Sequence, residues 1–340
     1  MATIKEVAKL AGVSVSTVSI IINNKAEERK ISPETQEKVN EVIRKLNYQP
    51  SVAAKRLRSN ELNSYTVGVF WSSDFRSSYL TRILTGLQEG LAQAKIPLDI
   101  VICPYETGKL HLQKKLYYTN SYNAILIANT TGEDDEYIHK NPISIPTILY
   151  NRESEVYHSV GIDNELTGRK AARHLISSGA KNITMICHNK LILGMSRRSK
   201  GFYNECVENG IKIDKKDIHY IDTSIHDGAN VAKELIDNKN IPDAIYCDSD
   251  SIAQGMLYTF NRSNISVPND VQVITIGLES RDYNKFYTPS ITAVDIPLEK
   301  MAAKCIEVIE AVANHKITSP SRFIFEAELI KRESTLNENI

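Results

Sequence analysis

Polar side chains with binding chemistry lie beyond the ends of several short apolar runs in this sequence. Carboxylates accept hydrogen bonds from paired hydroxyl groups, arginine donates them, and an aromatic ring covers the apolar face of a sugar ring. The combination therefore predicts a site for a polyhydroxylated ligand. The candidate residues are Ser72, Asp74, Tyr79, Asn151, Arg152, Arg198, Ser249, Asp250 and Glu279.

No catalytic motif accompanies these side chains. The sequence contains no GxSxG, GxxxxGK[ST], HExxH or GxGxxG pattern. Its eight histidines are dispersed, and its five cysteines are scattered without a CxxC pair, which indicates neither a zinc cluster nor a disulfide framework. We therefore expect a protein that is not an enzyme and that uses no cofactor and no metal.

The elements that must position the polar set alternate from Tyr65 onward. Short apolar runs alternate with amphipathic helical stretches, which is typical of an α/β fold with parallel, doubly wound sheets. Ligands bind such sheets beyond the carboxyl ends of the strands. The expected strands are 66–70, 98–103, 124–128, 147–149, 159–162, 182–187, 218–221, 244–247, 271–276 and 323–329. The expected helices include 79–94, 165–178, 200–209, 227–237 and 298–314.

The first 48 residues predict three helices, two of them in a helix-turn-helix arrangement. Gly12 can take the left-handed turn conformation, Ser14 can cap the second helix, and Ser32 with Pro33 indicates the start of the third. The formal charge of the chain is zero, yet residues 1–60 hold eleven basic and six acidic residues, a net charge of +5. A small basic module on an acidic body indicates a nucleic-acid partner at this end.

Two stretches carry a close resemblance to a known family. Residues 3–19, TIKEVAKLAGVSVSTVS, together with Asn23, resemble the head of LacI/GalR-family bacterial transcription regulators, and NYQP at 47–50 followed by VAAKRL at 52–57 resembles the hinge of that family. The match is specific over the first 60 residues and looser beyond them.

The resemblance implies a three-part organisation. A helix-turn-helix DNA-binding domain is expected over 1–48, a hinge helix and linker over 49–64, and an effector-binding and dimerisation body over 65–340. That body would resemble the two-lobed periplasmic sugar-binding proteins. The N-lobe is expected at about 65–163 and 296–322, and the C-lobe at about 164–292 and 323–335.

The resemblance also implies DNA contacts in the head and hinge. Val15 and Ser16 would meet base edges, with a smaller part for Ile4. Ile20 stands where many family members have arginine, and it can make only apolar contact, for instance with a thymine methyl group, so we expect an unusual operator. Leu57 would enter the minor groove as an apolar wedge. The other DNA-binding residues implied are Ser14, Thr17, Ser19, Asn23, Thr35, Tyr48, Ala54 and Lys55.

In the body, Arg198 and Asp250 match positions that the family uses on its effector. Glu279 replaces the more usual aspartate and reaches one methylene further. The resemblance implies a repressor of a carbohydrate-utilisation operon that a sugar releases, and it leaves a corepressor mode open. Simpler roles stand beside these: Asp250 could only cap helix 251–261, and Arg198 could only form a surface salt bridge.

Other functions remain as alternatives. One is a regulator that responds to a purine, a nucleoside or a protein corepressor, although no aromatic sandwich for a base is evident. Another is a sugar-binding protein or a sugar-acting enzyme, against which the lack of a paired acid and base weighs. No membrane span and no export signal is apparent, so a cytoplasmic, nucleoid-associated bacterial protein is expected. Without a leucine-heptad tail, a homodimer on palindromic double-stranded DNA is expected.

Overall fold

The computed structural model describes residues 4–22, 26, 29, 31–46, 65–73, 77–118, 121–189 and 192–337. The chain divides into two compact units, residues 1–63 and 64–340. No helix among the described residues is long and apolar enough to cross a lipid bilayer. The expected hinge helix and linker over 49–64 lie outside the described residues.

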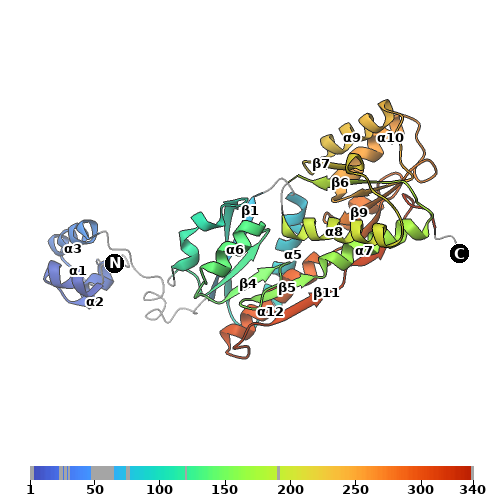
Figure 1. Ribbon diagram of the computed structural model, residues 1–340. Coiled ribbons are helices and arrows are strands. Elements are labelled where there is room, and N and C mark those ends of the chain that lie inside the picture. Colours follow the sequence, from blue (N-terminus) through green and yellow to red (C-terminus); the bar gives the residue numbers. More distant parts are fainter. Residues whose placement is uncertain are drawn as a thin grey trace. The chain divides into compact units, whose positions relative to one another are not determined.

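Three helices form the described part of the first unit (Figure 1): α1 (Ile4–Ala11), α2 (Val15–Ile22) and α3 (Pro33–Lys45). The hydroxyl of Ser32 caps α3, because it accepts a hydrogen bond from the N–H of Thr35 at 3.3 Å. Gly12 takes a φ of +65° between α1 and α2, as the turn requires. A small core lies between the helices, and its buried members are Val7, Ala8, Ala11, Val18, Ile21, Ala26 and Val39.

The second unit is built on two six-stranded sheets. The strands of the first sheet are β1 (Tyr65–Ser73), β2 (Leu98–Glu106), β3 (Ala124–Ala128), β4 (Thr147–Tyr150), β5 (His158–Ile162) and β11 (Arg322–Phe325). Those of the second are β6 (Ile183–His188), β7 (Ile218–Ile221), β8 (Ala244–Cys247), β9 (Gln272–Gly277), β10 (Thr292–Asp295) and β12 (Glu328–Ile330). The strand orders are β11-β5-β4-β3-β1-β2 and β12-β10-β9-β8-β6-β7. Among these described strands, every pair is parallel except β10 with β12.

Helices cover both faces of each sheet, which confirms the doubly wound prediction. The body helices are α5 (Ser77–Gln93), α6 (Gly132–Lys140), α7 (Asn164–Ser177), α8 (Leu193–Glu208), α9 (Ile225–Asp237), α10 (Asp250–Arg262), α11 (Arg281–Lys285) and α12 (Leu298–Ala313). Helices α5 and α12 pack together on one face of the first sheet, and α6 covers the other (Figure 1). Helices α7 and α8 cover one face of the second sheet, and α9 and α10 cover the opposite face.

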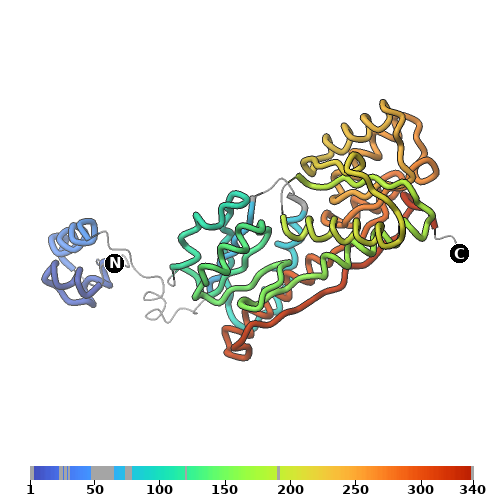
Figure 2. The backbone as a smooth tube through the Cα atoms, viewed as in Figure 1, coloured from blue at the N-terminus to red at the C-terminus, as the bar shows by residue number. Residues whose placement is uncertain are grey.

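The chain crosses three times between the N-lobe, built on the first sheet, and the C-lobe, built on the second (Figure 2). The crossings follow β5, β10 and β11. The sequence predicted a single last strand over 323–329, and this prediction is wrong. Residues 322–325 pair with β5 in the N-lobe, and residues 328–330 pair with β10 in the C-lobe. The last crossing therefore lies at 326–327 rather than at 322–323.

Helix α11 was not expected, and two longer helices also differ from expectation. Helix α8 begins seven residues before the expected start at 200, and the residue before it, Ile192, makes no side-chain capping bond, so the sequence carries no start signal there. Helix α6 was not expected, although Thr131 and Asp134 form a complete capping box at its start.

Glycines lie where paired helices of the C-lobe cross. A Cβ built on Gly168 of α7 would lie 1.9 Å from the carbonyl oxygen of Arg198 on α8, and one built on Gly201 would lie 2.2 Å from a carbonyl oxygen of α7. Gly228 and Gly255 have the same relation between α9 and α10. The backbones approach too closely for any side chain at these positions, and this contact fixes α8 against α7.

Candidate DNA and effector sites

Helix α2 begins with hydroxyl side chains. The Ser14 hydroxyl oxygen accepts a hydrogen bond from the N–H of Thr17 at 3.0 Å and lies 2.8 Å from the Thr17 hydroxyl oxygen. Ser32 and Thr35 repeat the arrangement at the start of α3. Ser16 is exposed beside this cap. In a helix-turn-helix, the N-terminal residues of the second helix face base edges in the major groove, so the cap lies at the end for which DNA contact is predicted.

The other head residues predicted to contact DNA differ in their exposure. Ile4 and Val15 are half-buried and pack against the head core, which leaves only part of each side chain for a base. Ser19, Ile20 and Thr35 are likewise half-buried. The predicted contacts that lie outside the described residues are Asn23, Tyr48, Ala54, Lys55 and Leu57.

In the body, the strand order reverses between β1 and β3 and again between β6 and β8. Open α/β sheets bind ligands at such reversals. Ser72, near the end of β1, is fully buried, and its hydroxyl oxygen lies 2.7 Å from that of Thr107. Tyr79 of α5 is buried with its ring 5.4 Å from the ring of Trp71. Asp74 lies outside the described residues.

Asn151, Arg152 and Arg198 come together at the boundary between the lobes. The Oδ1 atom of Asn151 accepts a hydrogen bond from Nδ2 of Asn164 at 3.0 Å, and Oδ1 of Asn164 accepts one from Nη1 of Arg198 at 2.8 Å. Arg152 donates from Nε to the hydroxyl of Thr130 at 2.7 Å and from Nη1 to the carbonyl of Asn151 at 2.6 Å. Sequence reasoning missed Asn164 and Thr130, which orient this cluster.

Both arginine side chains of this cluster are enclosed. Arg152 is 6% exposed and Arg198 is 2% exposed. The alternative of a surface salt bridge for Arg198 is therefore wrong. The lobes also touch nearby, where Thr131 before α6 and Ile192 before α8 form an isolated antiparallel bridge.

Asp250 and Glu279 lie together in the C-lobe. Oδ2 of Asp250 accepts hydrogen bonds from the N–H groups of Leu278 and Glu279, both at 2.7 Å, and Oδ1 accepts one from Nδ2 of Asn284. Asp250 is fully buried. The N-cap residue of α10 is Ser249, so the alternative that Asp250 only caps this helix is wrong. Asp250 fixes the loop after β9.

Arg82 of α5 joins the lobes, and the sequence analysis missed it. Its Nε and Nη2 atoms donate to the carboxylate of Glu299 at 2.6 and 2.7 Å, and Nη2 also donates to the carbonyl of Ile296 at 3.0 Å. Nη1 donates to the carbonyl of Glu279 at 3.1 Å and lies 3.5 Å from Oδ1 of Asp295. Arg82 thereby ties the loop after β9 to the N-lobe. A lone arginine on the apolar face of an amphipathic helix is the sequence signal that could have revealed it.

The burial of the Asp250 carboxyl group should make the stability of the body depend on pH. Burial raises the pKa of Asp250 to about 6, and the Glu279 carboxylate acts in the same direction. The folded chain therefore keeps this proton to higher pH than the unfolded chain, in which the pKa is about 3.9. The contribution to stability is complete below about pH 4 and is lost as the pH rises through 6.

We expect the free energy of unfolding of the wild type, relative to Asp250→Asn, to fall by about 2–3 kcal/mol between pH 4 and pH 7. Urea unfolding of both proteins across this range measures the difference. A difference that is constant with pH contradicts the raised pKa.

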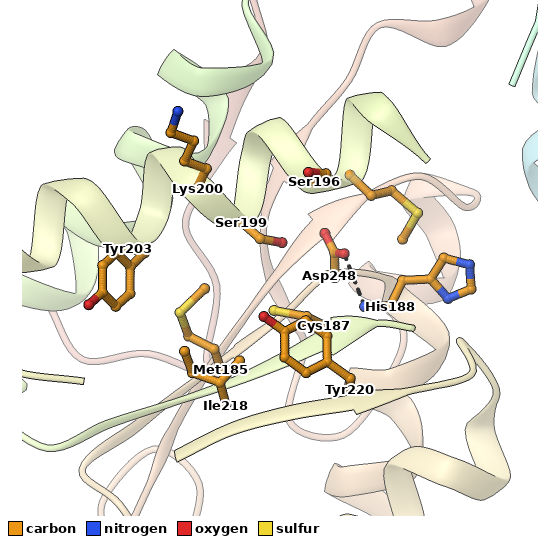
Figure 3. Close-up of a pocket in the computed structure, with 11 residues that line it drawn as sticks. Met185, Cys187, His188, Ser196, Ser199, Lys200, Tyr203, Ile218, Tyr220 and Asp248 are labelled. Carbon is orange, nitrogen blue, oxygen red and sulfur yellow. Dashed lines mark hydrogen bonds between the residues drawn. The ribbon is translucent and has the colours of Figure 1, made fainter. Parts of the chain in front are cut away.

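A separate cavity of about 360 Å³ lies in the C-lobe between β6, β7 and α8 (Figure 3). Figure 3 shows Met185, Cys187 and Tyr220 facing Ser199 and Tyr203 across it. Burial raises the pKa of the Cys187 thiol to about 12, so the thiol stays protonated near neutral pH and is a poor nucleophile. None of the predicted effector residues that the structure describes lines this cavity. The remaining lining residues are His188, Met195, Ser196, Lys200, Ile218 and Asp248.

Each of the two units matches a known family model. Residues 3–51 match the family model described as "Bacterial regulatory proteins, lacI family", and residues 172–335 match "Periplasmic binding protein-like domain". The chain is 41% identical to a LacI family transcription regulator from Clostridium acetobutylicum, whose crystal structure aligns over 79% of this chain and 100% of that chain with a TM-score of 0.74.

Two further relatives span nearly the whole chain. The HTH-type transcriptional repressor PurR of Actinobacillus pleuropneumoniae serotype 3 (strain JL03) is 28% identical over 343 residues, covering 100% of both chains. The structure of a complex of the transcriptional regulator CelR with cellobiose is 24% identical, covers 98% of this chain and 100% of that chain, and agrees in fold with a TM-score of 0.69.

The fold and the two sites define a DNA-binding transcriptional regulator with a periplasmic-binding-protein-like body. The chain belongs to the lacI family of bacterial regulatory proteins. This confirms the resemblance found in the head and hinge. Its relatives are regulators, so the enzyme alternative is set aside.

Proposed function

We propose that this regulator is a repressor whose operator binding is controlled by a small polyhydroxylated ligand, most simply a sugar, held between the lobes of the body. The observation that carries the proposal is the convergence of Asn151 and Arg152, from the N-lobe, with Arg198 from the C-lobe. A ligand that bridges them favours one arrangement of the lobes. A coupling of about 1–3 kcal/mol between effector and operator binding is typical of such proteins.

Further side chains near this cluster would contact the ligand or shape the cleft. Arg152 and Arg198 donate to the ligand, and Tyr79 covers its apolar face. Asp250 and Glu279 shape the cleft through the loop after β9, which Arg82 ties to the N-lobe. Ser72 and Ser249, with Asp74, complete the proposed effector set.

Site selection from a random duplex library tests this function. The full-length chain is incubated with the library alone, with a mixture of sugars, and with a mixture of purines and nucleosides. We expect a palindromic consensus that is lost with the sugars. A consensus that is the same with and without sugars contradicts the effector proposal. If either mixture strengthens operator binding, the ligand acts as a corepressor and does not release the operator.

For the head, we propose that Val15, Ser16 and Ile20 meet base edges in the major groove, with a smaller part for Ile4. Hydroxyl side chains at the helix starts would contact phosphates, which set the position of the head without reading sequence. The set that contacts phosphates or sugars is proposed as Ser14, Thr17, Ser19, Asn23 and Thr35. Tyr48, Ala54 and Lys55 are proposed as further DNA contacts, and Leu57 as a minor-groove wedge.

Ile20→Arg is expected to change the operator sequence. An arginine can make paired hydrogen bonds with guanine, a contact that discriminates by about 1–3 kcal/mol, whereas isoleucine makes only apolar contact. Library selection should therefore add a guanine at one position of each half-site. Ile20→Leu keeps the apolar contact and serves as the control with the wild-type consensus. An unchanged consensus for Ile20→Arg contradicts the role of Ile20 at a base.

We propose that the body forms a homodimer that acts on DNA in the bacterial cytoplasm, at the nucleoid. Large apolar side chains are exposed on α5, on the edge strand β2, and on α10 and α11, and they support an interface. They are Leu84, Val101, Ile102, Tyr258, Tyr283 and Phe286. Sedimentation equilibrium should give twice the 38.2 kDa mass of the chain, and a monomer at micromolar concentration contradicts this proposal.

A further inference from the structure

Three side-chain nitrogens gather around Gly194 of α8. The nearest neighbours of a Cβ built on Gly194 are Nδ2 of Asn151 at 3.3 Å, Nη1 of Arg152 at 3.4 Å and Nη1 of Arg198 at 3.4 Å. All three atoms are hydrogen-bond donors. Three donors gathered this closely can together bind a neighbouring oxygen that only accepts, whereas a hydroxyl group would also need an acceptor for its own proton.

These nitrogens lie at the start of a long helix. Gly194 is the second of the 16 residues of α8, the preceding Ile192 provides no side-chain cap, and the first turn holds no acidic residue. The N–H groups of a helix start carry partial positive charge and bind anions. The helix start and the three side chains therefore both favour the binding of an anion.

The two guanidinium groups bring positive charge that no carboxylate of the described residues contacts. Within the described ranges, no carboxylate oxygen lies within 4.0 Å of a guanidinium nitrogen of Arg152 or Arg198. The Nε atom of Arg198, a residue that is 2% exposed, has no hydrogen-bond partner among the residues that the structure describes. Burial lowers the pKa of Arg152 to about 10. The positive charge of Arg198 also lowers this pKa, and the negative charge of Asp135 raises it. Buried charge of this kind is costly until an ion of opposite sign binds.

We propose that the effector carries an oxyanion, a phosphate or a carboxylate group, that binds Asn151, Arg152 and Arg198 at the start of α8. Arginine recognises both groups through paired N–H donors. The inference rests on the proposed function and names the chemical class of its ligand. Since Arg152 and Asn151 belong to the N-lobe and Arg198 to the C-lobe, the anion would hold the lobes together.

Calorimetric titration of the full-length chain tests the chemical class. The panels are neutral pentoses and hexoses, their phosphate esters, and the corresponding uronic and aldonic acids, with inorganic phosphate as the anion alone. We expect a member of one anionic panel to bind about tenfold to a hundredfold more tightly than its neutral parent. The panel in which it occurs separates phosphate from carboxylate.

The outcomes separate this inference from the proposed function. A neutral sugar that binds as tightly as its anionic derivatives and releases the operator overturns the oxyanion and leaves the proposed function intact. No binding in any panel, and no release of the operator, overturns both.

Gly194→Ala tests the position of the anion without removing a charge. Its methyl group would lie 3.3–3.4 Å from the three nitrogens and push them aside, while alanine favours the helix, so the net change in the free energy of unfolding should be small. We expect affinity for the anionic ligand to fall about tenfold to a hundredfold, and Arg152→Gln should do the same. Lys200→Gln, which removes one exposed positive charge from the same helix, is the matched control and should bind as the wild type does. Wild-type affinity in Gly194→Ala overturns the proposal.

Discussion

Arg198→Met is expected to make the operator complex insensitive to the effector while leaving operator binding itself intact. The substitution keeps the length of the side chain but removes the guanidinium group that lies between Asn164 and the start of α8. Removing one partner from a buried, charged hydrogen-bonded contact costs about 2–4 kcal/mol, which corresponds to about 30-fold to 1,000-fold in effector affinity. Fluorescence anisotropy on the selected operator, titrated with effector, measures the loss.

The neighbouring residue offers a matched control for this variant. Arg197 is exposed on the same helix and lies 3.4 Å from the Glu153 carboxylate, in a surface pair that contributes little. Arg197→Met should respond to effector as the wild type does. Equal responses of Arg198→Met and the wild type would remove Arg198 from the effector site.

Gly168→Ala is expected to destabilise the body severely. The added Cβ would lie 1.9 Å from the Arg198 carbonyl oxygen and 2.8 Å from the Phe202 nitrogen, so α8 must move away from α7. Overpacking of this kind costs about 1–3 kcal/mol and occasionally more. Because the atoms in the way belong to backbone, we expect the upper end of that range, seen as a lower midpoint of urea unfolding. Displacing α8 should also weaken effector binding, since this helix carries Arg198.

Gly132→Ala in α6 is the control, because the nearest atom to its added Cβ would be 4.0 Å away. Its free energy of unfolding should change by less than about 1 kcal/mol. If Gly168→Ala were as stable as Gly132→Ala, the close crossing of α7 and α8 would be contradicted.

Local sequence patterns predict the elements of this chain where local forces decide them. Strands β3, β7 and β8 have the bounds expected from their apolar runs, and α3 begins where Ser32 and Pro33 indicate. The segment 323–329 shows the limit. Its apolar residues predict a strand, but its two halves pair with strands of different sheets, and that division depends on partners distant in the sequence.

The candidate effector site likewise has residues that the sequence predicts and residues whose part depends on contacts between distant segments. Arg152 and Arg198 could be predicted because strand ends and a family resemblance point to them. Gly194 and Asn164 could not, because their parts depend on how the start of α8 meets the end of β4. Arg82 stands within a helix, and only the folded chain shows that it contacts Glu299 and the loop after β9.

The central claim is that a ligand held between the lobes controls operator binding, and reciprocal coupling tests it most directly. Effector affinity is measured by calorimetry for the full-length protein, first free and then saturated with its selected operator duplex. The account predicts that the operator changes effector affinity about 5-fold to 150-fold, and that the effector changes operator affinity by the same factor. Identical effector affinity with and without operator would contradict the account, whatever the ligand.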